Sequence, residues 1–159
     1  MNEKIRNVTK EDLSGLKEVL DSSGLFPSEY LDDMIADYFN NPETEDIWIT
    51  GTINSINVAL AYCAPEKFTN GTYNLYAIGV KKEYQGKGIG QRMMQFIETL
   101  LKDNLNRILI VDTSGSDDYK SARQFYLKLG FRQEAIIRDF WNEGEDKITF
   151  WKKLNSELY

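Results

Sequence analysis

The spacing of hydrophobic and polar residues changes period several times along the chain, and each change predicts an element. Near the start, Ile5 and Val8 indicate a short strand, and Thr9 followed by Asp12 has the spacing of a helix cap. Two amphipathic helices follow, of which the second opens at Pro27 and is stopped by the Asn-Asn-Pro run at 40–42. The apolar faces consist of Leu13, Leu16 and Leu20 in the first helix and of Leu31, Met34, Ile35 and Tyr38 in the second.

The pattern changes to β-rich runs at residue 47. Three such runs, 47–53, 56–64 and 72–80, are separated by turn residues and predict an antiparallel meander. The order of all predicted elements is β-α-α-β-β-β-α-β-α-β-β, which indicates one α/β domain over residues 1–159 with a mixed rather than purely parallel sheet. The later elements are the longest helix at 88–103, a strand at 107–113, a helix at 121–130, and strands from 131 to about 140 and from 147 to 154.

Composition narrows the chemistry. The net charge of −6 offers no basic footprint for nucleic acid or for an anionic membrane, so neither is an expected partner. Histidine is absent and Cys63 is the only cysteine, which excludes Ser-His-Asp and Cys-His catalysis, a disulfide within the chain and a thiol-rich metal cage. We expect Cys63 to be a small buried strand residue, no metal to be bound, and any general base to be a carboxylate, a tyrosine, a lysine or a water. Without an apolar signal core or a run of about 18 apolar residues, a cytoplasmic protein is the default expectation.

A glycine-rich loop joins the strand at 72–80 to the longest helix. Gly86, Gly88 and Gly90 stand at alternate positions, and such a loop can turn its backbone N–H groups toward an anion at the helix N-terminus. Gln91 replaces the last glycine of the dinucleotide-binding pattern, and no glycine precedes a Lys-Ser or Lys-Thr pair as a Walker A loop requires. The loop alone fits a phosphate site and a glycine-softened helix start equally well.

Two motifs together resemble those of the GNAT superfamily of N-acetyltransferases. The first is Gln85-x-x-Gly88-x-Gly90, preceded by Tyr84, and the second is Ala122-x-x-Phe125-Tyr126-x-x-x-Gly130-Phe131. The resemblance implies a GNAT-like fold, a mixed and mostly antiparallel sheet of about seven strands flanked by helices on both faces. It also implies acetyl-CoA as cosubstrate and an amine acceptor. Many relatives are homodimers, so a homodimer is a further expectation.

The resemblance assigns roles to residues that match the family's motifs. Tyr126 corresponds to the general acid, and Asp112 to a position where some members carry a glutamate base. Tyr119 stands where the family often has a cofactor-binding asparagine, in a loop that is longer here, and Tyr119 and Arg123 are expected to take over that contact. The other cofactor-binding residues implied are Ile78, Gly79 and Val80 on the strand, for the pantetheine arm, and Gln85, Gly86, Lys87, Gly88, Ile89, Gly90 and Gln91 in the loop, for the pyrophosphate.

Alternatives stay open at several of these positions. Tyr126 also fits a core aromatic residue, and Asp112 also fits a turn-capping residue in Asp-Thr-Ser-Gly. Other acceptor-site or water-ordering groups are Tyr73, Asn74 and Tyr76. Aromatic residues that fit either an acceptor pocket or packing are Phe26, Tyr30, Phe140 and Trp141.

The predicted function is transfer of an acetyl group from acetyl-CoA to a primary amine, on a small molecule or a protein. The alternative is a noncatalytic acyl-CoA-binding regulatory domain.

Overall fold

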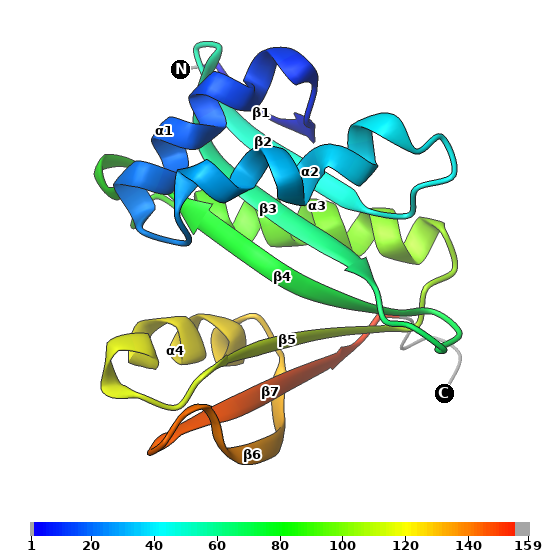
Figure 1. Ribbon diagram of the computed structural model, residues 1–159, viewed down its shortest axis with the longest axis vertical. Helices are drawn as coiled ribbons and strands as arrows, with labels where there is room; N and C mark the ends of the chain where they lie inside the picture. Colours follow the sequence, from blue (N-terminus) through cyan, green and yellow to red (C-terminus); the bar gives the residue numbers. More distant parts are fainter. Residues whose placement is uncertain (1, 155–159) are drawn as a thin grey trace. The chain divides into compact units, whose positions relative to one another are not determined.

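The computed structural model describes residues 2–154, which form seven strands and four α-helices (Figure 1). The elements are β1 (Glu3–Asn7), α1 (Leu13–Ser23), α2 (Leu31–Asn40), β2 (Ile47–Ile53), β3 (Ile56–Pro65), β4 (Thr72–Val80), α3 (Ile89–Asp103), β5 (Ile108–Ser114), α4 (Lys120–Lys128), β6 (Arg132–Asn142) and β7 (Glu145–Lys153). The strands form one sheet in the order β1-β2-β3-β4-β5-β7-β6. The described residues form two compact units, one of residues 2–65 and 76–100 and the other of residues 66–75 and 101–154.

The first unit places helices on both faces of its strands. Figure 1 shows α1 and α2 on one face of β2 and β3, and α3 on the other. Because side chains alternate along a strand, Trp48 packs with the core of α1 and α2, while a Cβ on Gly51 would lie 3.4 Å from Met93 Sδ of α3. The buried core against α1 and α2 consists of Val8, Leu16, Val19, Leu20, Leu31, Ile35, Trp48 and Leu60.

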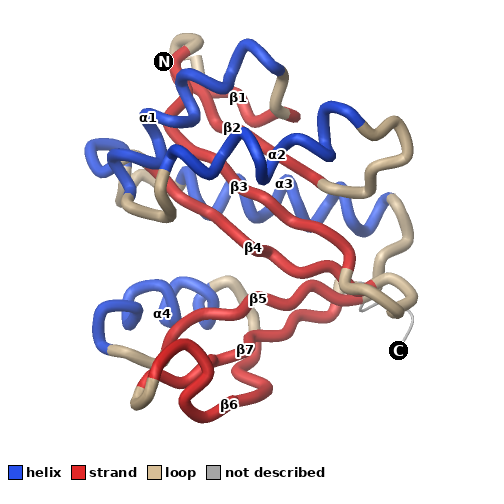
Figure 2. The backbone as a smooth tube through the Cα atoms, in the orientation of Figure 1, coloured by secondary structure: helices blue, strands red, loops and turns tan. Residues whose placement is uncertain are grey.

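The second unit contains the parallel step of the sheet. Thr72, Tyr73 and Asn74 of β4 pair in parallel with Ile108 to Ile110 of β5. The last strand of the described residues, β7, lies between β5 and β6 and is antiparallel to both. Figure 2 shows this order of strands. The sheet is therefore mixed and mostly antiparallel, as the sequence predicts.

Every predicted element is present, with small differences at the ends. One turn of 3₁₀ helix precedes each of α1, α2 and α4, because the chain tightens where the first N–H groups lack partners. Val8 follows β1 rather than ending it, and α3 begins at Ile89 rather than Gly88. Cys63 is fully buried on β3, so the expectation of a small buried strand residue is confirmed, and burial raises the pKa of its thiol to about 12. None of the helices within residues 2–154 is long and apolar enough to cross a membrane.

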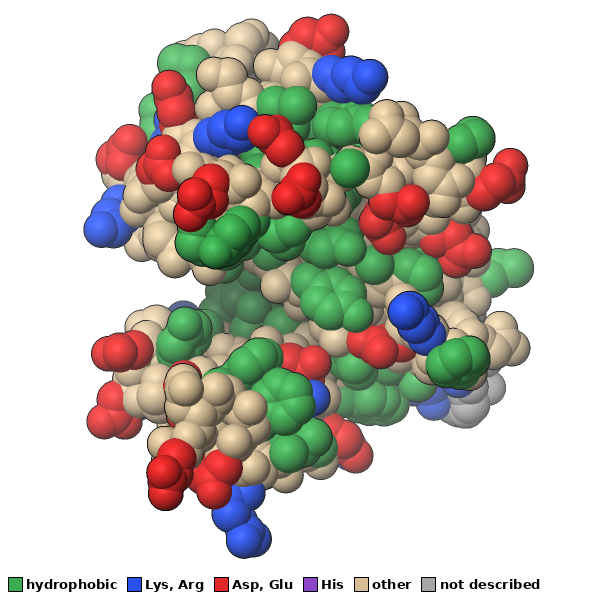
Figure 3. Space-filling model, viewed as in Figure 1, with side chains coloured by type: hydrophobic (Ala, Val, Ile, Leu, Met, Phe, Trp, Pro, Cys, Tyr) green, Lys and Arg blue, Asp and Glu red, His purple; other side chains and the backbone are tan. Residues whose placement is uncertain are grey.

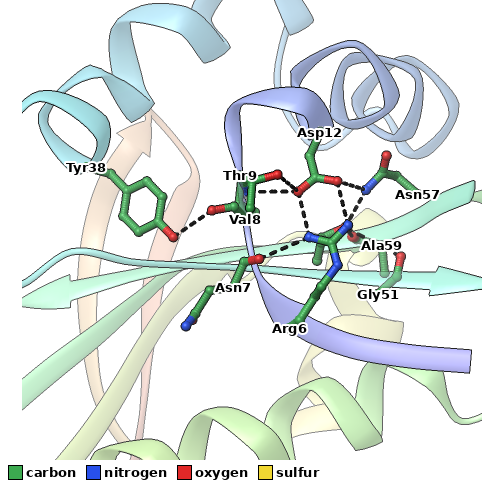
Figure 4. A network of polar contacts seen from close by, with 10 residues as sticks. Arg6, Asn7, Val8, Thr9, Asp12, Tyr38, Gly51, Asn57 and Ala59 are labelled. Atoms are coloured by element: carbon green, nitrogen blue, oxygen red, sulfur yellow. Dashed lines mark hydrogen bonds and ion pairs between the residues drawn. The ribbon is translucent and has the colours of Figure 1, made fainter. Parts of the chain in front are cut away.

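A buried polar network joins the start of the chain to β3 (Figure 4). Asp12, only 4% exposed, accepts two hydrogen bonds from the Arg6 guanidinium at 2.7 and 2.8 Å and one from Asn57 Nδ2 at 3.0 Å. The Thr9 backbone N–H also donates to Asp12, as the capping spacing predicts. A side chain on Gly15 would collide with Asn57, so a glycine is needed there for the network to form.

Replacing Asp12 by Asn is expected to destabilise the fold by about 2 kcal/mol at pH 7, because it leaves Arg6 without its counter-charge; the half-exposed guanidinium keeps the loss below that of a fully buried pair. The contact with Arg6 holds the pKa of Asp12 far below its usual value, so its stabilisation is present above pH ~4 and is lost as pH falls. Urea unfolding measures the difference, which should shrink below pH ~4. Asp32→Asn is the control: its exposed pair with Lys17 should cost less than about 0.5 kcal/mol, and an equal loss in both variants would contradict the prediction.

Candidate active site

Two of the three alternate glycines in the loop have a left-handed backbone. Gly86 and Gly88 have φ of +77° and +80°, a region that residues with a side chain rarely adopt. Around Gly86 no other side chain or backbone comes within 4 Å of a Cβ position, so the loop is open on that side. A Cβ on Gly88 would lie 2.7 Å from Arg92 Nη1. Both glycines are thus required by geometry.

The N–H groups of this loop are available to a ligand. The first helical bond of α3 runs from the Arg92 N–H to the Gly88 carbonyl at 3.1 Å. Within the described part of the chain, the backbone N–H groups of residues 86–91 have no acceptor. Unpaired N–H groups at the positive end of a helix dipole are the usual protein site for a phosphate. Lys87 lies at the same place, with its ammonium 5.4 Å from the Tyr84 ring centroid.

Hydrogen bonds fix the loop to the end of β4. Gln85 Nε2 donates to the Val80 carbonyl at 3.0 Å, and the Lys82 N–H donates to Ser22 Oγ at 3.0 Å. Gly79 packs tightly, since a Cβ on it would lie 3.0 Å from Leu25 Cδ2. These contacts hold the loop at 85–91 next to the predicted strand residues Ile78, Gly79 and Val80.

Asp112 lies in the second unit, in a polar cluster on β4, β5 and β7. Its Oδ1 accepts a 2.6 Å hydrogen bond from Thr149 Oγ1, and its Oδ2 accepts one of 3.2 Å from Asn74 Nδ2. The same amide nitrogen donates to Glu66 Oε1 at 2.7 Å. The Asn74 Oδ1 atom is buried without a hydrogen-bond partner among the described residues. Side chains, and not the turn backbone, thus hold the Asp112 carboxylate.

Tyr126 is buried in an aromatic cluster of the second unit. It is 6% exposed, and its ring contacts Phe125, Phe131 and Phe150 at centroid distances of 5.4, 5.8 and 5.6 Å. Burial raises the pKa of its hydroxyl to about 12, which keeps the proton on the oxygen at neutral pH. No group in residues 2–154 hydrogen-bonds that hydroxyl. The ring therefore packs in the core of this unit, while the hydroxyl has no hydrogen-bond partner among these residues.

Known proteins resemble this chain both in sequence and in fold. Residues 44–133, more than half of the chain, match the model of the Acetyltransferase (GNAT) domain. The chain belongs to the GNAT acetyltransferase family. The fold of this GNAT protein agrees with the relatives: it superposes on a GNAT-family protein from Desulfovibrio desulfuricans with a TM-score of 0.90 and 25% identity, covering 96% of this chain and 99% of the other.

Two further relatives match this chain in different ways, one over part of its sequence and the other in its fold. An uncharacterized N-acetyltransferase of Methanocaldococcus jannaschii is 29% identical over 84 residues, so the match spans about half of each protein, 52% of this chain and 53% of the relative. The PaiA N-acetyltransferase from Thermoplasma acidophilum, solved with coenzyme A, shares the fold with a TM-score of 0.71 and 20% identity, covering 96% and 99% of the two chains.

Arg123 holds the loop that precedes α4. Arg123 Nη1 donates to the carbonyls of Ser114 and Ser116 at 2.8 and 2.7 Å. Tyr119 is half exposed on the 3₁₀ turn that precedes α4. Arg123 therefore orders the loop that carries Tyr119, and a direct cofactor contact by either residue stays a prediction.

Sequence reasoning missed the internal structure of the β6–β7 hairpin. Asp139 has φ of +55°, its carboxylate accepts from the Gly144 N–H at 2.9 Å, and its own N–H donates to Asp146 at 3.0 Å. The Lys147 ammonium lies 4.1 Å from the Phe140 ring centroid. The residues from Asp139 to Lys147 thus build the hairpin. The sequence signal was an Asp, which tolerates positive φ, followed by a glycine at the turn.

Proposed function

We propose that the chain is an N-acetyltransferase that moves the acetyl group of acetyl-CoA to a primary amine. The observation that carries the proposal is the loop at 85–91, with two glycines at positive φ and a row of backbone N–H groups without acceptors. These groups fit the pyrophosphate of CoA, which needs close backbone approach and positive charge but no base recognition. The CoA complex of the Thermoplasma acidophilum relative supports this choice.

The strand that leads into the loop is proposed to hold the thioester. Backbone groups of Ile78 and Gly79 would bind the pantetheine arm, and a backbone N–H near Val80 would stabilise the tetrahedral oxyanion. A Cβ on Gly79 would lie 3.0 Å from Leu25 Cδ2, so a glycine at this position lets Leu25 lie directly against the strand backbone. An N–H donor placed where charge develops lowers the barrier of acyl transfer.

Two side chains are proposed to move protons. An amine of pKa about 10 is mostly protonated at pH 7, and Asp112, acting through a water, would take its proton. Attack of the neutral amine on the carbonyl carbon forms the C–N bond, and collapse of the oxyanion breaks the C–S bond. Tyr126 would give its phenolic proton to the leaving sulfur. A raised pKa is compatible with this role, because a hydroxyl that stays protonated is available as an acid.

A second copy of the chain is the proposed protein partner. The edge strand β6 is exposed along all eleven residues, and Ile136, Ile137, Phe140 and Trp141 are each between 44% and 57% exposed. Glu134 and Arg138 lie two residues to either side of Ile136. An antiparallel second β6 centred there would set opposite charges against each other. With a net charge of −6, we propose no nucleic-acid partner.

The test is acetyl-CoA-dependent thiol release with a panel of primary amines, run beside thermal unfolding. CoA at about 100 times its dissociation constant should stabilise the fold by about 2.7 kcal/mol, because it binds the native state only. Amine-dependent thiol release is expected in addition. A CoA shift without turnover on any amine would favour the regulatory alternative, and no shift at millimolar CoA would reject the cofactor assignment.

A further inference from the structure

The first unit contains a second concave feature, separate from the glycine loop. A pocket of about 350 Å³ is lined by side chains from the α1–α2 connection, α2, β3 and β4. The lining residues are Leu25, Phe26, Tyr30, Met34, Tyr62 and Tyr76. Four of the six are aromatic and none is charged, which is the usual lining of a site for an apolar body of this size.

The floor of the pocket is a rigid aromatic stack. The Tyr62 ring lies parallel to the buried Trp48 ring, with centroids 4.3 Å apart and an angle of 11°. On its other side Tyr62 contacts Tyr76 at 5.6 Å and 28°. Tyr30 and Tyr76 are 54% and 53% exposed, so their rings are accessible to a ligand. Because Trp48 and Tyr76 cover the two faces of Tyr62, a flat ring entering the pocket would meet the exposed rings of Tyr76 and Tyr30.

Leu25 connects this pocket to the strand proposed to hold the thioester. Its Cδ2 atom lies 3.0 Å from the Cβ position of Gly79, and Tyr76 is three residues before Gly79 on β4. A ligand body in the pocket would therefore end beside the backbone of Gly79 and Val80. An amino group one or two bonds beyond that body would be placed at the proposed site of attack.

The charge around the pocket favours a cation. Tyr62 has its pKa raised first by burial and then by the negative charges of Asp46 and Asp37. The first turn of α2 carries Asp32 and Asp33. Figure 3 shows acidic side chains over the part of the surface that carries α1 and α2, with hydrophobic side chains between them. An ammonium group is attracted to such a surface, and aromatic faces add cation–π attraction.

We propose that the acceptor is a small primary amine with an aromatic body, which stacks in this pocket and presents its amino group to the backbone at Gly79. This inference rests on the proposed acetyltransferase function and names the substrate class for it. A polyamine or an amino sugar would leave the aromatic lining without an apolar partner. Such amines are poor substrates on this account.

The experiment compares kcat/KM for three primary amines at saturating acetyl-CoA. Phenethylamine carries the aromatic body, 2-methoxyethylamine has similar basicity without it, and spermidine adds charge. We expect phenethylamine to be preferred by about 30-fold, the effect of burying one aromatic ring. Tyr30→Ser and Phe26→Ser should raise KM for phenethylamine by about tenfold and lower its kcat/KM advantage over 2-methoxyethylamine by a similar factor. Phe68→Ser, at a fully exposed aromatic residue outside the pocket, is the matched control.

The outcomes separate the inference from the function beneath it. Equal kcat/KM for the three amines, or pocket variants that affect all amines alike, would overturn the aromatic acceptor and leave the acetyltransferase standing. Turnover of none of the amines by a protein that binds CoA would overturn both. Melting temperatures with and without CoA verify the fold of each variant, and Tyr62→Leu provides a third ring deletion if one of the serine variants does not fold.

Discussion

Replacing Tyr126 by Phe is expected to lower kcat by about 10²- to 10⁴-fold, the usual contribution of a positioned general acid. The thiolate of CoA is a poor leaving group near neutral pH without a proton, since a thiol has a pKa of about 8.5. The ring contacts with Phe131 and Phe150 remain in the Phe variant, so the fold and the affinity for CoA should change little. Thiol release and CoA binding, measured on the same preparations, test this.

A second tyrosine provides the control for Tyr126. Tyr38 donates its hydroxyl to the Val8 carbonyl at 2.8 Å, a structural bond in the first unit. Tyr38→Phe should cost about 1 kcal/mol of stability and leave kcat unchanged. Since burial raises the pKa of Tyr126 to about 12, its acid form persists below that pH, and wild-type kcat should not fall between pH 7 and 10 through loss of this proton. A Tyr126→Phe variant with wild-type kcat would return the residue to the core.

Replacing Gly88 by Val is expected to weaken CoA binding by at least about 100-fold. Gly88 has φ of +80°, which a β-branched residue can adopt only under strain, and a Cβ there collides with the Arg92 guanidinium. Relief of that strain would turn the N–H groups of the loop away from a common anion. Isothermal titration with CoA measures the loss.

The matched control for Gly88 has the same backbone strain without the site. Gly144 has φ of +82° in the β6–β7 turn, with no other side chain or backbone within 4 Å of its Cβ position. Gly144→Val should lower the melting temperature and leave CoA affinity intact. Normal CoA binding by Gly88→Val would mean that the phosphate is held elsewhere, whereas equal losses in both variants would make the effect one of general strain.

Periodicity predicted the elements because each was decided by local pattern. The helix over 88–103 has its apolar residues on one side, and α3 occupies Ile89–Asp103. The sheet order was not predictable in the same way. In the sheet, β7 lies between β5 and β6. A hairpin pattern predicts that β6 pairs with β7, but it does not predict which strand pairs with the other edge of β7.

The candidate site likewise has one part that local sequence predicts and another part that only the folded structure shows. The alternate glycines at 86, 88 and 90 marked the loop from sequence alone, while the structure shows that Gly86 and Gly88 have positive φ and that Gly90 lies in α3. The partners of Asp112 come from two other strands, β4 and β7, so Thr149, 37 residues away, could not be assigned from spacing. The pocket lined by Leu25 could not be predicted from the sequence either. Tyr62 and Tyr76 meet Phe26 and Tyr30 only once two helices cover β3 and β4.

The hydrogen bond from the Lys82 N–H to Ser22 Oγ links the segment that leads into the proposed phosphate loop to the helix that leads into the aromatic pocket. We therefore expect binding at one proposed site to change the binding free energy at the other. Ser22 lies near the end of α1 and Leu25 in the connection that follows it, so a loop displaced by phosphate would move the wall of the aromatic pocket. Binding of the two substrates is then thermodynamically coupled. By reciprocity, whatever factor the amine adds to CoA affinity, CoA adds to amine affinity. Dissociation constants measured for either ligand alone would then understate the affinity in the ternary complex when the coupling is favourable.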